Sequence, residues 1–168
     1  MGRFQECMNE YREQLERGAL QRAYRGLMDY VMRLRSFFEK KYPDYSVSGS
    51  IYQGYMGMTY FSFFPESFKL WRLKVGIVFV HSTFRFEIWL FGYNKGVQAK
   101  YWKLFKERGW SKYRISSTTK GVDFIVEAVL VENPDFSDLV ALTGQIEKGA
   151  VKFIKDIDNF LSKHSEQV

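Results

Sequence analysis

The sequence predicts one α+β domain over residues 1–168, with a mainly antiparallel sheet of four or five strands flanked by N-terminal, middle and C-terminal helices. The first observation behind this is the order of the elements, ααββββαβα. Four consecutive strands precede the next helix, and this lack of regular alternation argues against a doubly wound parallel sheet. The second is that no repeat, low-complexity tract or Pro/Gly/Ser-rich linker divides the chain. The third is an aromatic content of 18%, which gives even a small domain a substantial core.

Two helices are expected before the first strand. Residues 4–17 have a helical pattern, and Gly18 follows as a C-terminal stop. The second helix covers residues 20–42 and ends at Pro43, which cannot continue it. Cys7, the single cysteine, lies on the first helix and is expected to be a small core side chain rather than a nucleophile.

Four apolar runs rich in β-branched and aromatic residues then predict strands, at residues 50–56, 59–64, 74–81 and 84–91. The last two runs are separated by a short turn, so a simple hairpin pairs residues whose numbers sum to 165. In this register Gly76 lies opposite Trp89 and is expected to leave room for the indole.

The C-terminal part adds a helix over residues 95–108, a fifth strand over 122–131 and a final helix. Asn133 as N-cap and Pro134 at the first helical position predict where the final helix begins. Unbroken to Lys163, that helix would be about 45 Å long. Because the expected radius of gyration is only about 15 Å, we expect a bend or break near Gly144.

Composition excludes several classes of protein. One cysteine excludes a disulfide-stapled scaffold, and no apolar run reaches the roughly 20 residues of a membrane span. The first residues carry charges where a signal peptide needs an apolar segment, so a cytoplasmic protein without membrane contact is expected. With two histidines and one cysteine, no spacing suits a Cys/His metal site, and no nucleotide-binding motif is present. We therefore expect no metal and no cofactor.

One candidate surface is a basic helix face formed by Lys95, Lys100, Lys103 and Lys106, which lie within about 140° of arc. With Trp102 at its border, this face would suit weak contact with a polyanion or nucleic acid, the lysines meeting phosphates and the indole stacking. The alternative is a solvated face that only aids solubility.

The second candidate is a polar and aromatic sheet face. Arg85, Glu87 and Trp89 alternate along one strand and therefore share one side of the sheet. An ion pair beside an aromatic ring would suit a small polar or zwitterionic ligand, with Tyr52 and Tyr60 as its aromatic wall. The alternative is a structural Arg–Glu pair.

Several segments resemble a family of small prokaryotic single-domain proteins that is classed only as a domain of unknown function. The resemblance runs from about residue 24 to residue 157 and is carried by Gly26–Met28, Leu34–Arg35, Ser50–Met56, Thr59–Phe61, Phe86–Leu90, Lys100–Trp102 and Val131–Phe136. It implies an intact single domain. No activity, ligand or catalytic residue comes with it.

Two classes of function follow from these features. The preferred one is a non-catalytic cytoplasmic binding or interaction module, with the basic helix and the polar-aromatic sheet face as its surfaces. The alternative is an enzyme that acts on a small polar substrate through Arg85 and Glu87. His81 suits that role less well because it belongs to the opposite face of the hairpin. The identity of a ligand and the oligomeric state stay open.

Overall fold

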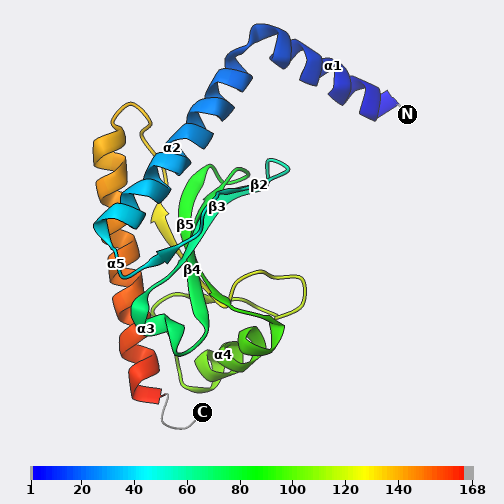
Figure 1. The fold of residues 1–168 in the computed structure, drawn as a ribbon. Helices are drawn as coiled ribbons and strands as arrows, with labels where there is room; N and C mark the ends of the chain where they lie inside the picture. The colour runs from blue at the N-terminus through cyan, green and yellow to red at the C-terminus, as the bar shows by residue number, and fades with distance from the viewer. Residues whose placement is uncertain (1, 165–168) are drawn as a thin grey trace.

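The structure is a computed structural model that describes residues 2–164. Over this range it has five helices and an open antiparallel sheet of seven strands, which confirms the α+β class (Figure 1). The elements are α1 (Gly2–Arg17), α2 (Ala19–Lys41), β1 (Ser46–Val47), β2 (Tyr52–Gly54), β3 (Met58–Phe64), α3 (Glu66–Lys69), β4 (Leu73–Val80), β5 (Arg85–Gly92), α4 (Lys95–Glu107), β6 (Arg114–Ile115), β7 (Val126–Val131) and α5 (Leu139–His164).

The strand order is β1-β3-β4-β5-β7-β6, with β2 also paired to β3. The five expected strands correspond to β2, β3, β4, β5 and β7. Two more, β1 and β6, have two residues each, too few to show a period in the sequence. The hairpin register is confirmed, since Val78 pairs with Glu87 and Gly76 with Trp89. The space above Gly76 is taken by a different ring, because a Cβ there would lie 2.6 Å from Phe91.

The main core lies between one face of the sheet and the helices α2 and α5, with α4 packed at one end. The apolar stripe of α2 supplies Val31, Leu34 and Phe38, and these meet the inward side chains of β3, β4 and β5. The opposite sheet face carries a smaller cluster of Val78, Trp89, Phe91 and Phe124. Both faces of the central strands therefore carry buried apolar side chains.

The final helix differs from the expectation in its start and its continuity. Asp135 accepts hydrogen bonds from Ser137, and the Asp138 carboxylate caps the helix by accepting from the Ala141 amide at 3.0 Å, so α5 begins at Leu139. The expected break at Gly144 is absent. Figure 1 shows α5 running along the length of the molecule, so the helix needs no break to fit.

The first helix stands apart from the rest. Gly18 has φ 70° and ends α1 as expected, and α1 then projects away from the sheet at an angle to α2 (Figure 1). None of its residues is buried, so the expectation that Cys7 lies in the core is wrong; its side chain is exposed. Within residues 2–164, no helix is both long and apolar enough to cross a bilayer.

Candidate functional site

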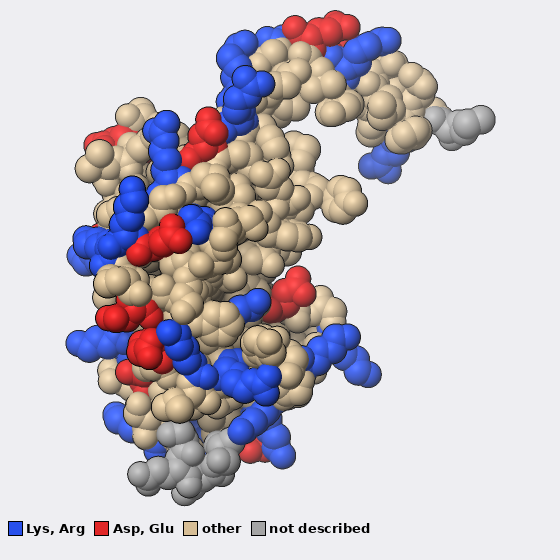
Figure 2. Space-filling model, in the orientation of Figure 1, with Lys and Arg blue, Asp and Glu red and all other residues tan. Residues whose placement is uncertain are grey.

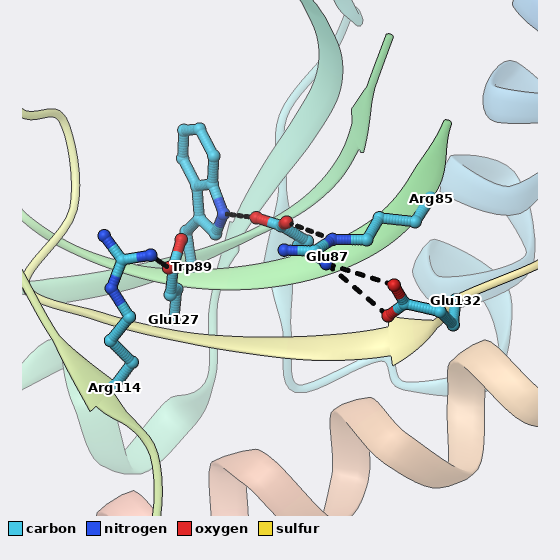
Figure 3. A network of polar contacts seen from close by, with 6 residues as sticks. All are labelled: Arg85, Glu87, Trp89, Arg114, Glu127 and Glu132. Carbon is cyan, nitrogen blue, oxygen red and sulfur yellow. Dashed lines mark hydrogen bonds and ion pairs between the residues drawn. The ribbon is translucent and has the colours of Figure 1, made fainter. Parts of the chain in front are cut away.

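The three polar-aromatic residues of β5 form one hydrogen-bonded cluster (Figure 3). Arg85 Nε donates to one Glu87 oxygen at 2.7 Å, and Trp89 Nε1 donates to the other at 2.6 Å. Glu87 is only 4% exposed, so the carboxylate is held inside the protein with both oxygens in use. The period of two along the strand thus brings these side chains together, as the sequence indicates.

Three further charged residues, which no pattern in the sequence singled out for this site, complete the cluster. Arg114 on β6 pairs with Glu127 on β7 at 2.7 Å, and Arg85 also reaches Glu132 at 3.2 Å (Figure 3). Glu127 was available as an acid inside a predicted strand. Its place beside Trp89 depends on the β5–β7 pairing, which no local pattern reveals.

A β-bulge brings Glu132 to this cluster. The register between β5 and β7 shifts between Phe86 and Glu87, and both Leu130 and Val131 pack against the main core. Because two successive residues then face inward, Glu132 returns to the side that carries Arg85.

The electrostatics of the cluster are uneven, since three carboxylates share two guanidinium groups. Burial, and next the neighbouring Glu87 carboxylate, raise the pKa of Glu127 above its ordinary value, while Arg114 and Arg85 oppose the shift. Beside these groups lies a cavity of about 330 Å³ lined by Arg85, Glu87, Arg114 and Glu127, among others. The cluster is therefore acidic, closely bonded and open on one side.

Tyr52 and Tyr60 lie elsewhere on the same sheet face and do not line this cavity. Their rings contact each other at 5.0 Å between centroids, and Tyr60 stacks on Phe91 at 5.9 Å. Tyr60 pairs with Val78 on β4, so a whole strand separates it from Glu87. The two tyrosines thus do not line the cavity at the charged cluster, although Tyr60 packs on the apolar cluster that contains Trp89. A role for them in ligand binding stays a prediction.

The four lysines of α4, Lys95, Lys100, Lys103 and Lys106, are all exposed. The face carries both signs, because Glu107 lies 3.7 Å from Lys103. Trp102 is half-buried, its indole N–H donates to the Ser116 carbonyl at 2.8 Å, and Lys106 Nζ lies over its ring at 5.4 Å from the centroid. Polyanion binding by this face stays a prediction.

An apolar hollow lies on the other side of the molecule, where α1, α2, two strand turns and the start of α5 meet. We call it the elbow groove. It consists of two cavities of about 490 and 570 Å³ that share Leu20, Tyr24 and Met56. Its walls are mostly apolar, and its remaining lining side chains include Tyr11, Leu15, Met28, Ala23, Leu27, Tyr30, Phe84, Phe136 and Leu139.

Two of the residues that line the elbow groove have an unusual backbone conformation. Met56 has φ 58° and Phe84 has φ 51°, and both side chains are more than half exposed. The left-handed region costs a residue with a Cβ about 1–2 kcal/mol, and asparagine or glycine tolerates it better. The chain therefore presents two large apolar side chains to the groove at a cost in stability, as is typical of functional surfaces.

Two polar groups of the elbow groove, the Tyr30 hydroxyl and the His81 imidazole, are already bonded within the protein. His81 Nε2 lies 2.9 Å from the Thr59 hydroxyl, and burial lowers the pKa of the imidazole. Arg22 and Arg25 lie along the rim. Among residues 2–164, no group of three or more His, Cys, Asp or Glu is placed to hold a metal ion.

The fold and these surfaces define an α+β protein with an open antiparallel sheet, one apolar groove and one buried charge cluster. The chain belongs to the family described as Domain of unknown function (DUF7000), whose model matches residues 4–161, and this confirms the resemblance to a domain of unknown function. No curated protein matches the chain, and no solved structure matches it either.

Proposed function

We propose that the protein is a non-catalytic, cytoplasmic binding module whose elbow groove receives an amphipathic helix. The observation that carries this proposal is the groove itself, continuous from Tyr11 on α1 to Leu139 at the start of α5. Two strained apolar residues, Met56 and Phe84, project into it. Grooves of this kind hold the apolar face of a helix through anchors spaced three or four residues apart.

A helix suits this groove better than a small polar ligand. The two cavities adjoin through three shared side chains, which favours a long occupant with several apolar anchors. Polar groups inside it are scarce, whereas a small-molecule site places a few free polar groups to orient its ligand. His81 is already bonded to Thr59 and so offers little for that purpose.

The hydrogen bonds within the charged cluster argue against an enzyme that acts through Arg85 and Glu87. A catalytic carboxylate must reach a substrate, but both oxygens of the nearly buried Glu87 accept bonds from neighbouring side chains. Arg85 is equally engaged, with Glu87 and Glu132. The geometry therefore favours the binding module over the enzyme that acts through Arg85 and Glu87.

Fluorescence anisotropy tests the groove. The probe is a labelled 16-residue amphipathic peptide of leucine, lysine and glutamate, titrated with the full chain. We expect binding that the groove variant Met56→Asn weakens about tenfold or more, since an anchor side chain is removed. The control is Leu70→Asn, which removes an exposed apolar side chain that lies outside the groove. Equal binding by both variants, or no binding by a wild type that is monomeric at the assay concentration, would contradict the proposal.

A second candidate function is the binding of a small cation or zwitterion at the charged cluster. It is favoured by the excess of carboxylates, three against two guanidinium groups, beside the cavity at this cluster. A thermal-shift screen of amines and amino acids at neutral pH tests it, with Glu127→Gln as the variant that should lose any response. If no compound raises the melting temperature, the cluster is structural.

A further inference from the structure

We infer that the occupant of the elbow groove is α1 of a second copy of this chain, so that two chains form a two-fold dimer by exchanging their N-terminal helices. This inference rests on the proposed function, because it names the partner of the same groove. The evidence is that one molecule carries both the groove and an amphipathic helix that lacks a partner.

The apolar stripe of α1 consists of Phe4, Met8, Tyr11 and Leu15. These positions follow one another at intervals of four, three and four residues, so they fall within about 60° of arc on one side of the helix. In Figure 2 charged side chains gather along the outer edge of α1, while much of the edge toward the hollow is uncharged. This is the pattern of a helix that binds through one face.

α1 also needs a partner for its own stability. It has 16 residues, and not one of them is buried. Helices of this length are marginal in water unless an apolar face is packed against something. Its packing on the start of α2 leaves Phe4 73% exposed.

In a two-fold dimer, both ends of the apolar stripe of α1 pack against a groove. Tyr11 and Leu15 line the groove of their own chain, whereas Phe4 and Met8 lie beyond the residues that line it. In an isologous contact the outer end of each helix enters the groove of the other chain, and each contact occurs twice. Phe4 and Met8 of one copy then meet the strained Met56 and its neighbours in the other.

The available area agrees with a stable dimer. Five large apolar side chains are exposed by 43–73% on α1 and in the groove, namely Phe4, Met8, Tyr11, Met56 and Phe84. At roughly 150–250 Å² for a fully buried aromatic side chain, they offer about 500 Å² of apolar surface. A standard interface buries about 800 Å² per partner, of which about 57% is nonpolar.

The charges are compatible with the exchange. Arg22 and Arg25 lie at the rim of the groove, and α1 carries four glutamates against three arginines. The net charge of α1 is therefore −1 against two arginines at the rim, so charge repulsion does not oppose the entry of α1 into the groove of a second copy.

Sedimentation equilibrium of the full chain over a concentration series tests the inference. We expect a dimer whose dissociation constant rises about 30-fold or more in Phe4→Glu with Met8→Glu, because two anchors are removed. The matched control, Arg3→Gln with Arg17→Gln, changes the net charge of α1 equally but leaves the stripe intact, and it should dimerise like the wild type. A monomeric wild type, or equal effects of the two double variants, overturns the inference.

Mixing separates helix exchange from any other dimer. The stripe variant has an intact groove, and the groove variant Met56→Asn with Phe84→Asn has an intact stripe. Each should be monomeric alone, with a circular dichroism spectrum that keeps the sheet signal and loses at most the helical signal of the 16 residues of α1. The mixture should form a heterodimer through one remaining contact. Absence of the heterodimer when both single species are monomeric contradicts helix exchange.

The probe peptide distinguishes this inference from the proposed function. If the wild type is monomeric but binds the leucine–lysine–glutamate peptide in a Met56-dependent way, the groove serves a helix of another protein and only the dimer is wrong. If the protein neither dimerises nor binds that peptide, both proposals are wrong. If the stripe variant also binds a synthetic peptide of residues 2–17, the dimer and the groove are both supported.

Discussion

Single residues on the sheet face are held by specific pairings of donor and acceptor. Glu87 is nearly buried, and the pairing works because the carboxylate has two acceptor oxygens for two donors, Arg85 Nε and Trp89 Nε1. A buried charge without such partners would cost several kcal/mol. The cluster is thus stable on its own, whether or not a ligand binds beside it.

Glu87→Gln should lower the free energy of unfolding by about 1–3 kcal/mol. An amide has only one acceptor oxygen, so either the Arg85 or the Trp89 N–H must then face the NH₂ group. Urea denaturation measures the change, and the exposed Glu132→Gln, which weakens a surface pair, should cost less than about 1 kcal/mol. A Glu87→Gln protein as stable as the wild type would show that the buried pair does not support the fold.

Met56 differs from Glu87, because its replacement should stabilise the fold while it weakens binding in the elbow groove. Asn tolerates the left-handed conformation that Met56 adopts at φ 58°, so Met56→Asn should raise the free energy of unfolding by up to about 1 kcal/mol. It should also weaken binding in the elbow groove, since the exposed side chain is removed. Urea denaturation and the peptide titration check the two effects. For comparison, Leu70→Asn sits at a negative φ of −59° and should not gain stability.

At the scale of elements, sequence patterns predict single helices and hairpins, but not the pairing of strands that are distant in the sequence. The β4–β5 hairpin and the helices α2 and α4 follow from period and turn signals, and so does the half of the charged cluster that β5 carries. The other half, Arg114, Glu127 and Glu132, depends on strand pairing between distant segments. The two residues of β6 give no period at all.

Competition between neighbouring signals explains the errors in the last helix. Asn133-Pro134 and Asp138 both match a helix start, and the side-chain turn from Asp135 to Ser137 makes Asp138 the cap. The elbow groove was not predicted, because its walls come from elements whose relative placement cannot be derived from local sequence patterns. The apolar residues at helical spacing on α1, which the structure shows to be exposed, could have indicated a contact surface.

The basic face of α4 is tested as one element. We predict weak, sequence-independent retention of oligonucleotides at low salt, and Lys100→Glu with Lys103→Glu should abolish it. Removal of one lysine–phosphate interaction should flatten the slope of log affinity against log salt by about 0.9 for duplex DNA. Filter binding over a salt series measures this. Unchanged retention in the double variant would falsify the prediction and leave a solvated face.

At the scale of the whole molecule, α5 ties distant parts of the chain together through two carboxylates. Glu147 pairs with Lys41 at the end of α2, at 2.6 Å. Asp156 accepts hydrogen bonds from Lys112 at 2.8 Å and from the Tyr113 hydroxyl at 2.6 Å, which anchors the segment that leads into β6. The loss of either carboxylate charge therefore loosens the packing between segments far apart in the sequence.

The stability of the protein should fall as the solution becomes acidic, and Asp156 should contribute to that fall. Burial alone would raise its pKa, but bonds from Lys112, Lys152 and Tyr113 outweigh it and hold the pKa below the ordinary 3.8. A carboxyl whose folded pKa is depressed stabilises the fold above its ordinary pKa. This contribution is lost as the pH falls below about 4 and through the folded value.

Asp156→Asn removes this titration and isolates its share of the acid response. The variant should be less stable than the wild type near neutral pH. The two urea midpoints should converge progressively as the pH falls from about 4 toward the folded pKa of Asp156, because the unfolded chain takes up a proton there before the folded one does. Glu107→Gln is the control, because its exposed pair with Lys103 contributes little, and its curve should follow that of the wild type. Curves for Asp156→Asn and the wild type that stay parallel down to about pH 2 would mean that the ion pairs of α5 do not stabilise the fold.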